Sequence, residues 1–324
     1  MSLEKNSKIT FKFNEIFSRD IIRDVYSDMR VELLSSDPEL DKILTRIFSQ
    51  HGKGIRPFFM ALVAELVGGS WDSLRRAAMV IEAIHLSSLL HDDVIDGSEL
   101  RRGVATMNAQ HSNKISVLFG DHIFISALKI ASELENSEAI KIIHRAVKRM
   151  VEGEIRDTLN NEIIDEDTYI RIIGDKTASL FAASGEIGVV LSGVNGIEKI
   201  WARELGESLG TAFQIIDDTL DYNGKKEVMG KPKYMDVMSG NITLPLIYTL
   251  REKTPGEIKK IFSEHEGSIE KLSEIVRING GIEYAYKCTR DYSEKARDIL
   301  SRFDNKKTRS VFDSFFNVLM EHCC

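Results

Sequence analysis

Two clusters of aspartates share one spacing and are the residues of this chain best suited to bind a metal ion. They are Asp92-Asp93-Val94-Ile95-Asp96 and Asp217-Asp218-Thr219-Leu220-Asp221. On a helix, carboxylates at positions i and i+4 lie one turn apart on the same face, where like charges repel. Mg²⁺ prefers a few carboxylates together with phosphate oxygens and water, and it would relieve that repulsion. The spacing therefore predicts two magnesium-binding helix ends that act on a phosphate-bearing ligand.

The segments around the clusters place them at the ends of helices. A long apolar run precedes each cluster, over residues 81–90 and 209–216, and a helix-stop signal follows, at Gly97 and at Asn223-Gly224. In the last turn of a helix the dipole also disfavours negative charge. One such acidic end is most simply a solvated surface. Two matching ends on helices with apolar faces favour a functional site.

Basic residues that could complete a phosphate site lie in short segments along the chain. Pro57 suits the first position of a helix, which places Lys53 and Arg56 at a helix N-terminus, where anions bind. Arg101 and Arg102 follow the first cluster and could either pair with its aspartates or grip a diphosphate, since guanidinium groups match phosphate. Weaker candidates are Lys176, Thr177 and Lys231.

His85 lies seven residues before Asp92 and so shares its helix face two turns back. A lone histidine there is more often a hydrogen-bonding core residue than a ligand, although a diphosphate oxygen would also suit it. No Ser/His/Asp or Cys/His nucleophile set stands out in the sequence. The residues therefore favour electrostatic stabilisation of a departing diphosphate over a covalent intermediate.

The pattern along the whole chain predicts the elements that must position these residues. Only five of 324 residues are proline, and apolar residues recur at three- and four-residue spacing, for example over 74–88 and 139–150. That period predicts an all-α, single-domain bundle over residues 1–324, with roughly ten or more helices and an apolar interior.

Composition limits the partners and the compartment. The net charge of −7 argues against nucleic acid as a partner. Cys288, Cys323 and Cys324 have no zinc-binding spacing and fit a reducing compartment without disulfides. The N-terminus has no apolar signal core, and no apolar run reaches the roughly 20 residues needed to span a membrane. We expect a cytoplasmic protein, which an apolar product could bring to a membrane surface.

Taken together, the motifs resemble those of the trans-isoprenyl diphosphate synthase family, over roughly residues 53–245. The matching segments are Gly52-Lys53-Gly54-Ile55-Arg56-Pro57, Leu90-His91-Asp92-Asp93-Val94-Ile95-Asp96 with Arg101-Arg102-Gly103, Gly120-Asp121, Lys176-Thr177-Ala178, Phe213-Gln214-Ile215-Ile216-Asp217-Asp218-Thr219-Leu220-Asp221, Gly230-Lys231-Pro232 and Thr243-Leu244-Pro245. The resemblance implies an all-α homodimer of the isoprenoid synthase type, with a deep central cavity in each subunit. Such an enzyme joins isopentenyl diphosphate to an allylic diphosphate through an allylic cation.

The resemblance also assigns roles to individual residues. It implies Mg²⁺ as the cofactor, bound by Asp92, Asp96 and Asp217, with Asp93 and Asp221 close by. The residues that match the family's isopentenyl diphosphate site are Lys53, Arg56, His85 and Arg102. Those that match its allylic site, where catalysis takes place, are Arg101, Lys176, Thr177, Gln214 and Lys231.

Three positions depart from the family's pattern. Asn241 stands where the family usually has a lysine before the Thr-Leu-Pro, which removes one phosphate contact on the allylic side. Tyr234 stands two residues before Asp236, where glycine is usual. The Glu-Gly-Glu-x-x-Gln pattern ends here in Asp157. These departures bear on the rate of turnover more than on the fold or the reaction.

Product length is expected to depend on the helix face that leads back from Asp92. One helical turn rises about 5.4 Å, close to the length of a prenyl unit, so each turn can act as a gate. Short-chain synthases of the resembling family place an aromatic ring four or five residues before the first aspartate, whereas this chain has Ser88 and Ser87. The floor would then lie deeper, at Ile84, Ile81 or a facing residue such as Phe124. We therefore expect a product longer than fifteen carbons, with a long-chain polyprenyl diphosphate favoured over the twenty-carbon geranylgeranyl diphosphate. The alternative is that the serines only permit close helix packing.

Three other functions compete with a synthase. A class I terpene cyclase uses the same ionisation, but its second motif carries Ser/Thr and Glu where this chain has Asp221 and Lys225. An HD-type phosphohydrolase would use His91 and Asp92 and would leave the second cluster unexplained. A non-catalytic synthase subunit generally lacks one aspartate motif, and both are present here.

Overall fold

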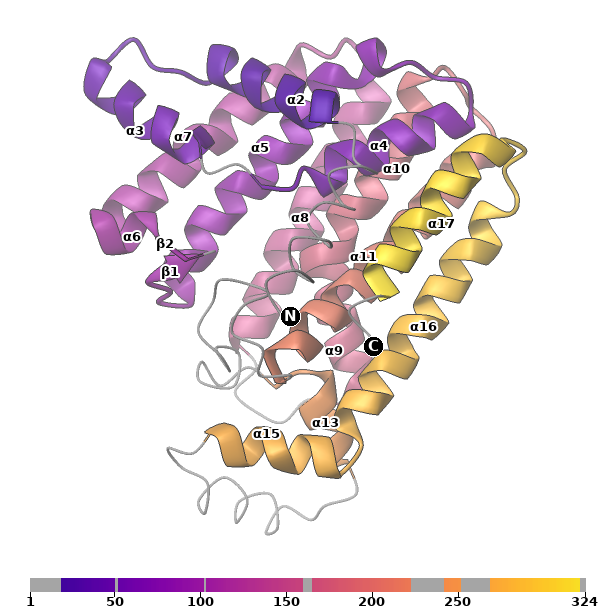
Figure 1. Ribbon diagram of the computed structural model, residues 1–324. Helices are drawn as coiled ribbons and strands as arrows, with labels where there is room; N and C mark the ends of the chain where they lie inside the picture. The colour runs from indigo at the N-terminus through magenta and orange to yellow at the C-terminus, as the bar shows by residue number, and fades with distance from the viewer. Residues whose placement is uncertain are drawn as a thin grey trace.

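The computed structural model describes residues 19–49, 52–101, 103–159, 165–222, 242–251 and 269–320, and this part of the chain is a bundle of α-helices (Figure 1). The all-α fold predicted from the apolar periodicity is confirmed. One hairpin was not predicted: β1 (Leu100–Arg101) and β2 (Val104–Ala105) pair antiparallel, with Leu100 opposite Ala105. Strands of two residues are too short to show a period of their own.

The helices follow one another with short connections. In chain order they are α2 (Arg19–Glu32), α3 (Pro38–Ser49), α4 (Ile55–Leu66), α5 (Trp71–Ile95), α6 (Met107–Gln110), α7 (Asn113–Ser132), α8 (Ser137–Leu159), α9 (Glu166–Ile173), the π-helix η1 (Gly174–Ala178), α10 (Ser179–Leu191), α11 (Glu198–Tyr222), α13 (Leu244–Leu250), α15 (Ile269–Ile278), α16 (Gly281–Leu300) and α17 (Lys306–Met320).

Helix α10 lies at the centre of the bundle and is buried from Ser179 to Val190. Helix α11 packs closely along it because two glycines let the backbones approach. A Cβ at Gly206 would lie 2.5 Å from the carbonyl oxygen of Phe181, and a Cβ at Gly210 would lie 2.6 Å from Cα of Ala178. This contact fixes α11, and with it the second aspartate cluster, against α10 and η1.

Helix α5 is the second central element and carries the first aspartate cluster. Its middle turns, from Ala77 to Ile84, are buried in a core shared with α2, α7, α8 and α10. A second core joins α4, α11, α16 and α17. The two long helices that end in aspartates are therefore each fixed by a hydrophobic core along most of their length.

Helix α7 is long and apolar enough to cross a membrane, by length and composition only, and is the one such helix in the described part of the chain. The sequence analysis expected no membrane-spanning run because it considered only uninterrupted apolar residues. Helix α7 is largely apolar but is interrupted by Asp121 and Lys129. The inner face of α7 packs on α5, with Ser116, Ile123 and Ala127 inaccessible to solvent. That burial is typical of a helix packed within a bundle.

Candidate active site

The first aspartate cluster ends helix α5, as the sequence predicted. The helix ends at Ile95, and Gly97 has a φ of 61°, which residues with a side chain rarely adopt. The N–H of Asp96 donates to the carbonyl of Asp92 at 2.8 Å, and the N–H of Ser98 donates to the carbonyl of Asp93 at 2.9 Å. Asp92 and Asp93 therefore occupy the last turn, and Asp96 caps it on the exposed surface.

The second cluster lies in the last turns of α11, which ends at Tyr222. The two clusters divide their aspartates in the same way. Asp92 and Asp217 are half-buried, and within the described residues neither has a hydrogen bond or an ion pair. Asp93 and Asp218 are only 3% and 6% exposed, and both are held by other side chains. The first aspartate of each cluster is thus available to a ligand, whereas the second anchors the helix end.

Asp93 is anchored by the hairpin that follows α5. Its Oδ1 accepts from Nε of Arg101 at 2.8 Å and lies 2.8 Å from Nη2 of the same residue. Asn108 donates to the carbonyl of Asp93 at 3.2 Å. The sequence left open whether Arg101 would pair with an aspartate or bind a diphosphate. In the described structure it pairs with Asp93, so its role toward the allylic diphosphate remains a prediction.

Asp218 is anchored by two helices. Its Oδ2 accepts from the hydroxyl of Tyr169 on α9 at 2.5 Å, and its Oδ1 accepts from Nε2 of Gln214 at 2.7 Å. The Oε1 of Gln214 in turn accepts from the hydroxyl of Thr177 at 2.7 Å. Thr177 and Gln214, which the sequence assigned to one site, are thus in direct contact and are linked to Asp218 of the second cluster.

The π-helix η1 connects the two clusters. Its Lys176 lies 2.6 Å from Oδ2 of Asp157 and 2.8 Å from Oε2 of Glu154, both on α8, and acts electrostatically on Asp92. The next residue, Thr177, contacts the second cluster through Gln214. Consecutive residues of η1 therefore serve the two aspartate ends. Single turns of π-helix occur frequently at functional sites.

The electrostatic surroundings of Asp92 disfavour its charged form. The pKa of Asp92 is raised to about 7, chiefly by burial and next by the charge of Glu154, with Asp96 adding to the shift and Lys176 and Arg101 opposing it. Within the described residues, no group of three or more His, Cys, Asp or Glu side chains is placed to hold a metal ion. Carboxylate donors suit a hard divalent cation, which would take further ligands from phosphate oxygens and water.

The predicted anion site before α4 is built around one inward-facing arginine. Lys53 is exposed, and Gly54 begins α4 with a φ of 57°. The guanidinium of Arg56 lies 4.8 Å from the ring centroid of Phe181. Burial lowers the pKa of Arg56 to about 10, and its buried Nε has no hydrogen-bond partner among the described residues. A buried donor without a partner is costly, and an anion could satisfy it.

Two residues that the sequence analysis missed support this loop. The hydroxyl of Tyr26 on α2 donates to Oε1 of Glu82 at 2.6 Å and accepts from the N–H of Gly52 at 2.9 Å. Glu82 also acts electrostatically on Arg56. Glu82 could have been suspected from the sequence, because it is a charged residue inside the apolar run that leads to half-buried His85.

The residues predicted to control product length occupy different environments. Ser87 is buried, and its hydroxyl donates to the carbonyl of Gly120 on α7 at 2.9 Å. This is the close helix packing that the sequence analysis kept as its alternative. Ser88 is half-buried, and its hydroxyl donates to the carbonyl of His85 at 2.9 Å. Ile84 is buried in the core, with Phe124 packed against the same core.

Other predicted residues are placed only in part or not at all. Asp96 is exposed and Asp221 is half-buried, and their roles toward the metal remain predictions. Arg102, Lys231, Tyr234 and Asn241 lie outside the described residues. The sequence analysis did not assign Glu154 or Tyr169, because their significance comes from contacts with residues distant in the sequence.

Known proteins with this architecture identify the family. Residues 37–279 match the family model of polyprenyl synthetase. Octaprenyl diphosphate synthase of Escherichia coli (strain K12) is 35% identical over 293 residues, which cover 88% of this chain and 90% of that protein. A polyprenyl synthase of Caulobacter crescentus CB15, whose crystal structure is a complex with calcium and isoprenyl diphosphate, superposes with a TM-score of 0.86 at 30% identity, over 94% of this chain and 96% of that one. A decaprenyl diphosphate synthase of Rhodobacter capsulatus superposes with a TM-score of 0.84 at 28% identity, over 98% and 99% of the two chains. The chain therefore belongs to the polyprenyl synthetase family.

Proposed function

We propose that this protein is a trans-prenyltransferase that condenses isopentenyl diphosphate with an allylic diphosphate, head to tail, and releases diphosphate. The observation that carries the proposal is the matched pair of helix ends. Asp92 and Asp217 are the first aspartates of their clusters, and within the described residues both are free of protein partners. Lys176 and Thr177 on one π-helical turn serve both ends. Two acidic ends joined by a cation suit a diphosphate leaving group.

The residues divide the work of the reaction. Asp92 and Asp217, with Asp96 and Asp221 nearby, would hold Mg²⁺, which supplies Lewis-acid stabilisation of the departing diphosphate when bound. Lys176 contributes a further positive charge at that position. Thr177 donates its hydroxyl to Gln214, which in turn holds Asp218 in the second cluster. The apolar bundle keeps water from the allylic cation until the double bond of isopentenyl diphosphate attacks it.

A second set of residues would bind isopentenyl diphosphate. Arg56 offers a buried Nε without a hydrogen-bond partner among the described residues, and exposed Lys53 lies at the same helix N-terminus. His85 lies on α5, two turns before Asp92. Orientation by these groups would place the homoallylic double bond toward the allylic carbon, and positioning of this kind can lower a barrier substantially.

A product longer than fifteen carbons, in the long-chain range, fits both the chain and its relatives. Neither Ser87 nor Ser88 can close the first turn below Asp92 as an aromatic ring would. Two of the relatives named above are octaprenyl and decaprenyl diphosphate synthases. A product of this kind is apolar along most of its length, so contact with a membrane surface would help its release from a cytoplasmic enzyme.

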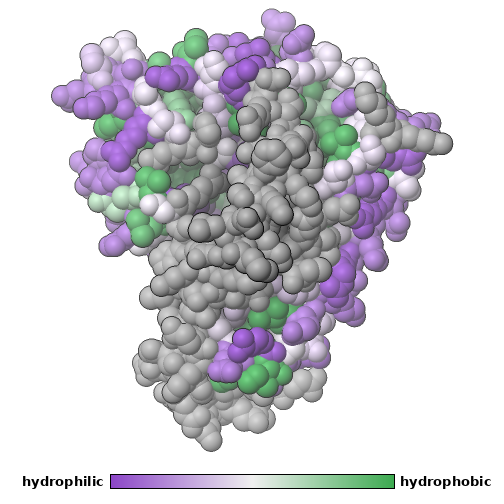
Figure 2. Space-filling model, in the orientation of Figure 1, coloured by the Kyte–Doolittle hydropathy of each residue, from purple (hydrophilic) through white to green (hydrophobic). Residues whose placement is uncertain are grey.

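The exposed face of α7 supports a homodimer. Leu118 and Ile125 are 52% and 63% exposed, and Val117 and Leu128 are also exposed on this helix. Figure 2 shows further hydrophobic side chains on the flank that carries the β1–β2 hairpin, where Leu100 and Val104 are exposed. A second copy of the chain would cover such a face. Leu118→Glu should shift the protein toward monomer in analytical ultracentrifugation, and an unchanged mass would exclude this face.

One assay tests the reaction. The protein is incubated with isopentenyl diphosphate and Mg²⁺, with and without farnesyl diphosphate, and the dephosphorylated products are separated by chromatography. We expect elongation that requires both substrates and stops when the metal is chelated. A cyclic hydrocarbon from farnesyl diphosphate alone would indicate a cyclase, release of inorganic phosphate would indicate a phosphohydrolase, and no product would indicate a non-catalytic subunit.

A further inference from the structure

The ammonium of Lys176 is held by two carboxylates of helix α8. It lies 2.6 Å from Asp157 and 2.8 Å from Glu154, and all three side chains are about one-third exposed or less. Burial alone would lower the pKa of Lys176, but the two carboxylates outweigh it and raise the pKa above its ordinary value. One carboxylate would suffice to balance the charge of Lys176. With two carboxylates, the three groups together carry a net negative charge near Asp92.

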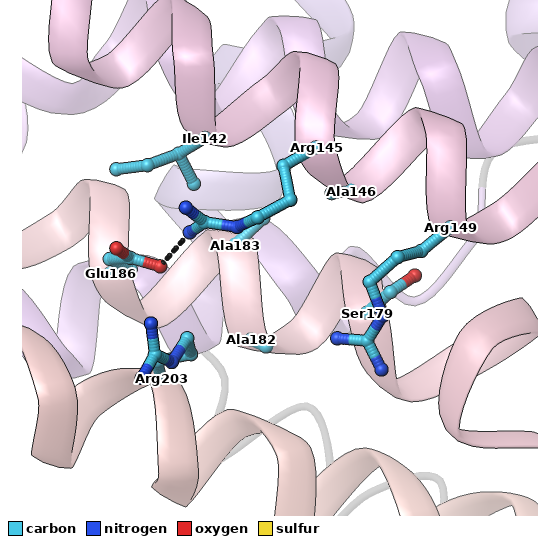
Figure 3. A pocket seen from close by; sticks show the side chains of 9 residues that line it. All are labelled: Ile142, Arg145, Ala146, Arg149, Ser179, Ala182, Ala183, Glu186 and Arg203. Carbon is cyan, nitrogen blue, oxygen red and sulfur yellow. Dashed lines mark hydrogen bonds and ion pairs between the residues drawn. The ribbon is translucent and has the colours of Figure 1, made fainter. Parts of the chain in front are cut away.

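The backbone that carries Lys176 is fixed from the same helix. Asp175 accepts from Nε of Arg149 at 2.8 Å and from Nη1 of Arg156 at 2.7 Å. Gly153 lies so close that a Cβ there would be 2.9 Å from the backbone nitrogen of Lys176. Figure 3 shows Arg149 extending from α8 toward Ser179 of α10, in a cleft where Arg145 pairs with Glu186. Since these contacts hold the backbone of the turn, Lys176 could exchange its partners by a movement of its side chain alone.

This arrangement separates two tasks on successive residues of α8. Arg156 holds the backbone turn through Asp175, whereas Asp157 holds only the tip of the lysine side chain. Asp157 contacts the group that the proposed function assigns to the allylic diphosphate. An anion that binds Lys176 must therefore compete with Asp157, which repels it as well.

We propose that Asp157 is a positioning residue that latches the Lys176 ammonium before substrate arrives and thereby sets the affinity for the allylic diphosphate. The latch rests on the proposed function, since it assumes that Lys176 binds the diphosphate. When the diphosphate binds, Lys176 leaves Asp157 and keeps its contact with Glu154. Breaking the Lys176–Asp157 contact weakens binding of the allylic diphosphate and leaves binding of isopentenyl diphosphate unchanged.

Three variants test the latch. Asp157→Asn keeps the shape and removes the charge, so the KM for farnesyl diphosphate should fall roughly three- to fivefold, as expected for one partly screened ion pair. The KM for isopentenyl diphosphate should not change. Asp157→Glu restores the carboxylate and should return the allylic KM toward the wild-type value. The matched control is Glu152→Gln, which removes an exposed carboxylate from α8 that pairs with Lys148 and not with Lys176.

The outcomes separate the latch from other roles of Asp157. An unchanged allylic KM, or an equal change in both KM values, would overturn the proposal while leaving the synthase activity established. A higher Mg²⁺ requirement with a lower kcat would show that Asp157 is a metal ligand and also overturn it. If the wild-type protein makes no product, the proposed function fails. Calorimetric binding of an unreactive farnesyl thiolodiphosphate still decides the latch, which requires tighter binding in Asp157→Asn than in Glu152→Gln.

Discussion

Metal binding to this site should release a proton, because a carboxylate at its centre is partly protonated near neutral pH. Burial raises the pKa of Asp92 to about 7, with the charge of Glu154 as the next contribution. A divalent cation needs the deprotonated carboxylate, so it must displace this proton. The apparent affinity for the metal should therefore rise as the pH rises through 7.

The size of the effect follows from that pKa. The apparent dissociation constant is multiplied by one plus the ratio of protonated to deprotonated Asp92. With a pKa of about 7, this factor is about 11 at pH 6 and about 1.1 at pH 8, so affinity should change about tenfold, or about 1.4 kcal/mol. The stability of the folded protein changes with pH in the opposite direction to the metal affinity. The folded, metal-free protein binds the extra proton between the ordinary pKa of 3.8 and about 7, so its stability should fall as the pH rises through this window.

The measurement uses a metal without substrate, since diphosphate titrates in the same range. Mn²⁺ accepts oxygen ligands as Mg²⁺ does, and its free concentration can be followed by electron paramagnetic resonance at pH 6, 7 and 8. Asp217→Asn is the matched control: it removes one predicted ligand from the other cluster and leaves Asp92 in place. It should weaken binding and keep the tenfold pH dependence, whereas Asp92→Asn should lose the dependence. Equal affinity at pH 6 and pH 8 in the wild-type protein, or the same slope in Asp92→Asn, would refute this account of Asp92.

Four further substitutions test other parts of the structure. Asp217→Ala should lower turnover by orders of magnitude, because it removes a metal ligand that stabilises the leaving group, and circular dichroism should show unchanged helix content. Ser88→Phe should shorten the main product on chromatography; Ser87→Phe should instead lower the melting temperature, since Ser87 packs against Gly120. Gly206→Ala should reduce the free energy of unfolding in urea by about 1–3 kcal/mol, since its Cβ would lie 2.5 Å from the carbonyl of Phe181; an unaltered midpoint would contradict the close contact of α10 and α11.

The helix ends could be predicted from the sequence because their signals are local. Apolar periodicity, paired aspartates and Gly97 all lie within a few turns of one another, and the structure ends α5 where they indicate. The division between Asp92 and Asp93 could not be predicted in this way. Both are aspartates on one helix, and they differ because Asp93 meets Arg101 from the hairpin. In the second cluster, Asp218 meets Tyr169 from 49 residues away.

The same limit applies to the serines on α5. Ser87 and Ser88 are adjacent and equal in type, and sequence spacing gave both of them the same role. Successive residues on a helix point about 100° apart, so neighbours face different elements. Ser87 faces α7 and bonds to Gly120, whereas the hydroxyl of Ser88 bonds back to its own helix. Tertiary packing decides which face of the helix meets a neighbouring helix, and the spacing of residues in the sequence does not indicate it.

The structure of the carboxylates also bears on the order in which ligands bind. Burial and the charge of Glu154 disfavour the charged form of Asp92, and Lys176 and Arg101 offset this only in part. A divalent cation bound at Asp92 or Asp217 would take further ligands from phosphate oxygens and water. Phosphate oxygens would complete its coordination, and the metal would in turn neutralise the carboxylates that repel the diphosphate. Each ligand then strengthens binding of the other by the same factor, since coupling between two bound ligands is reciprocal. A site of this kind binds either ligand alone weakly. The charges of the carboxylates, the metal ion and the diphosphate are best balanced when both ligands are bound.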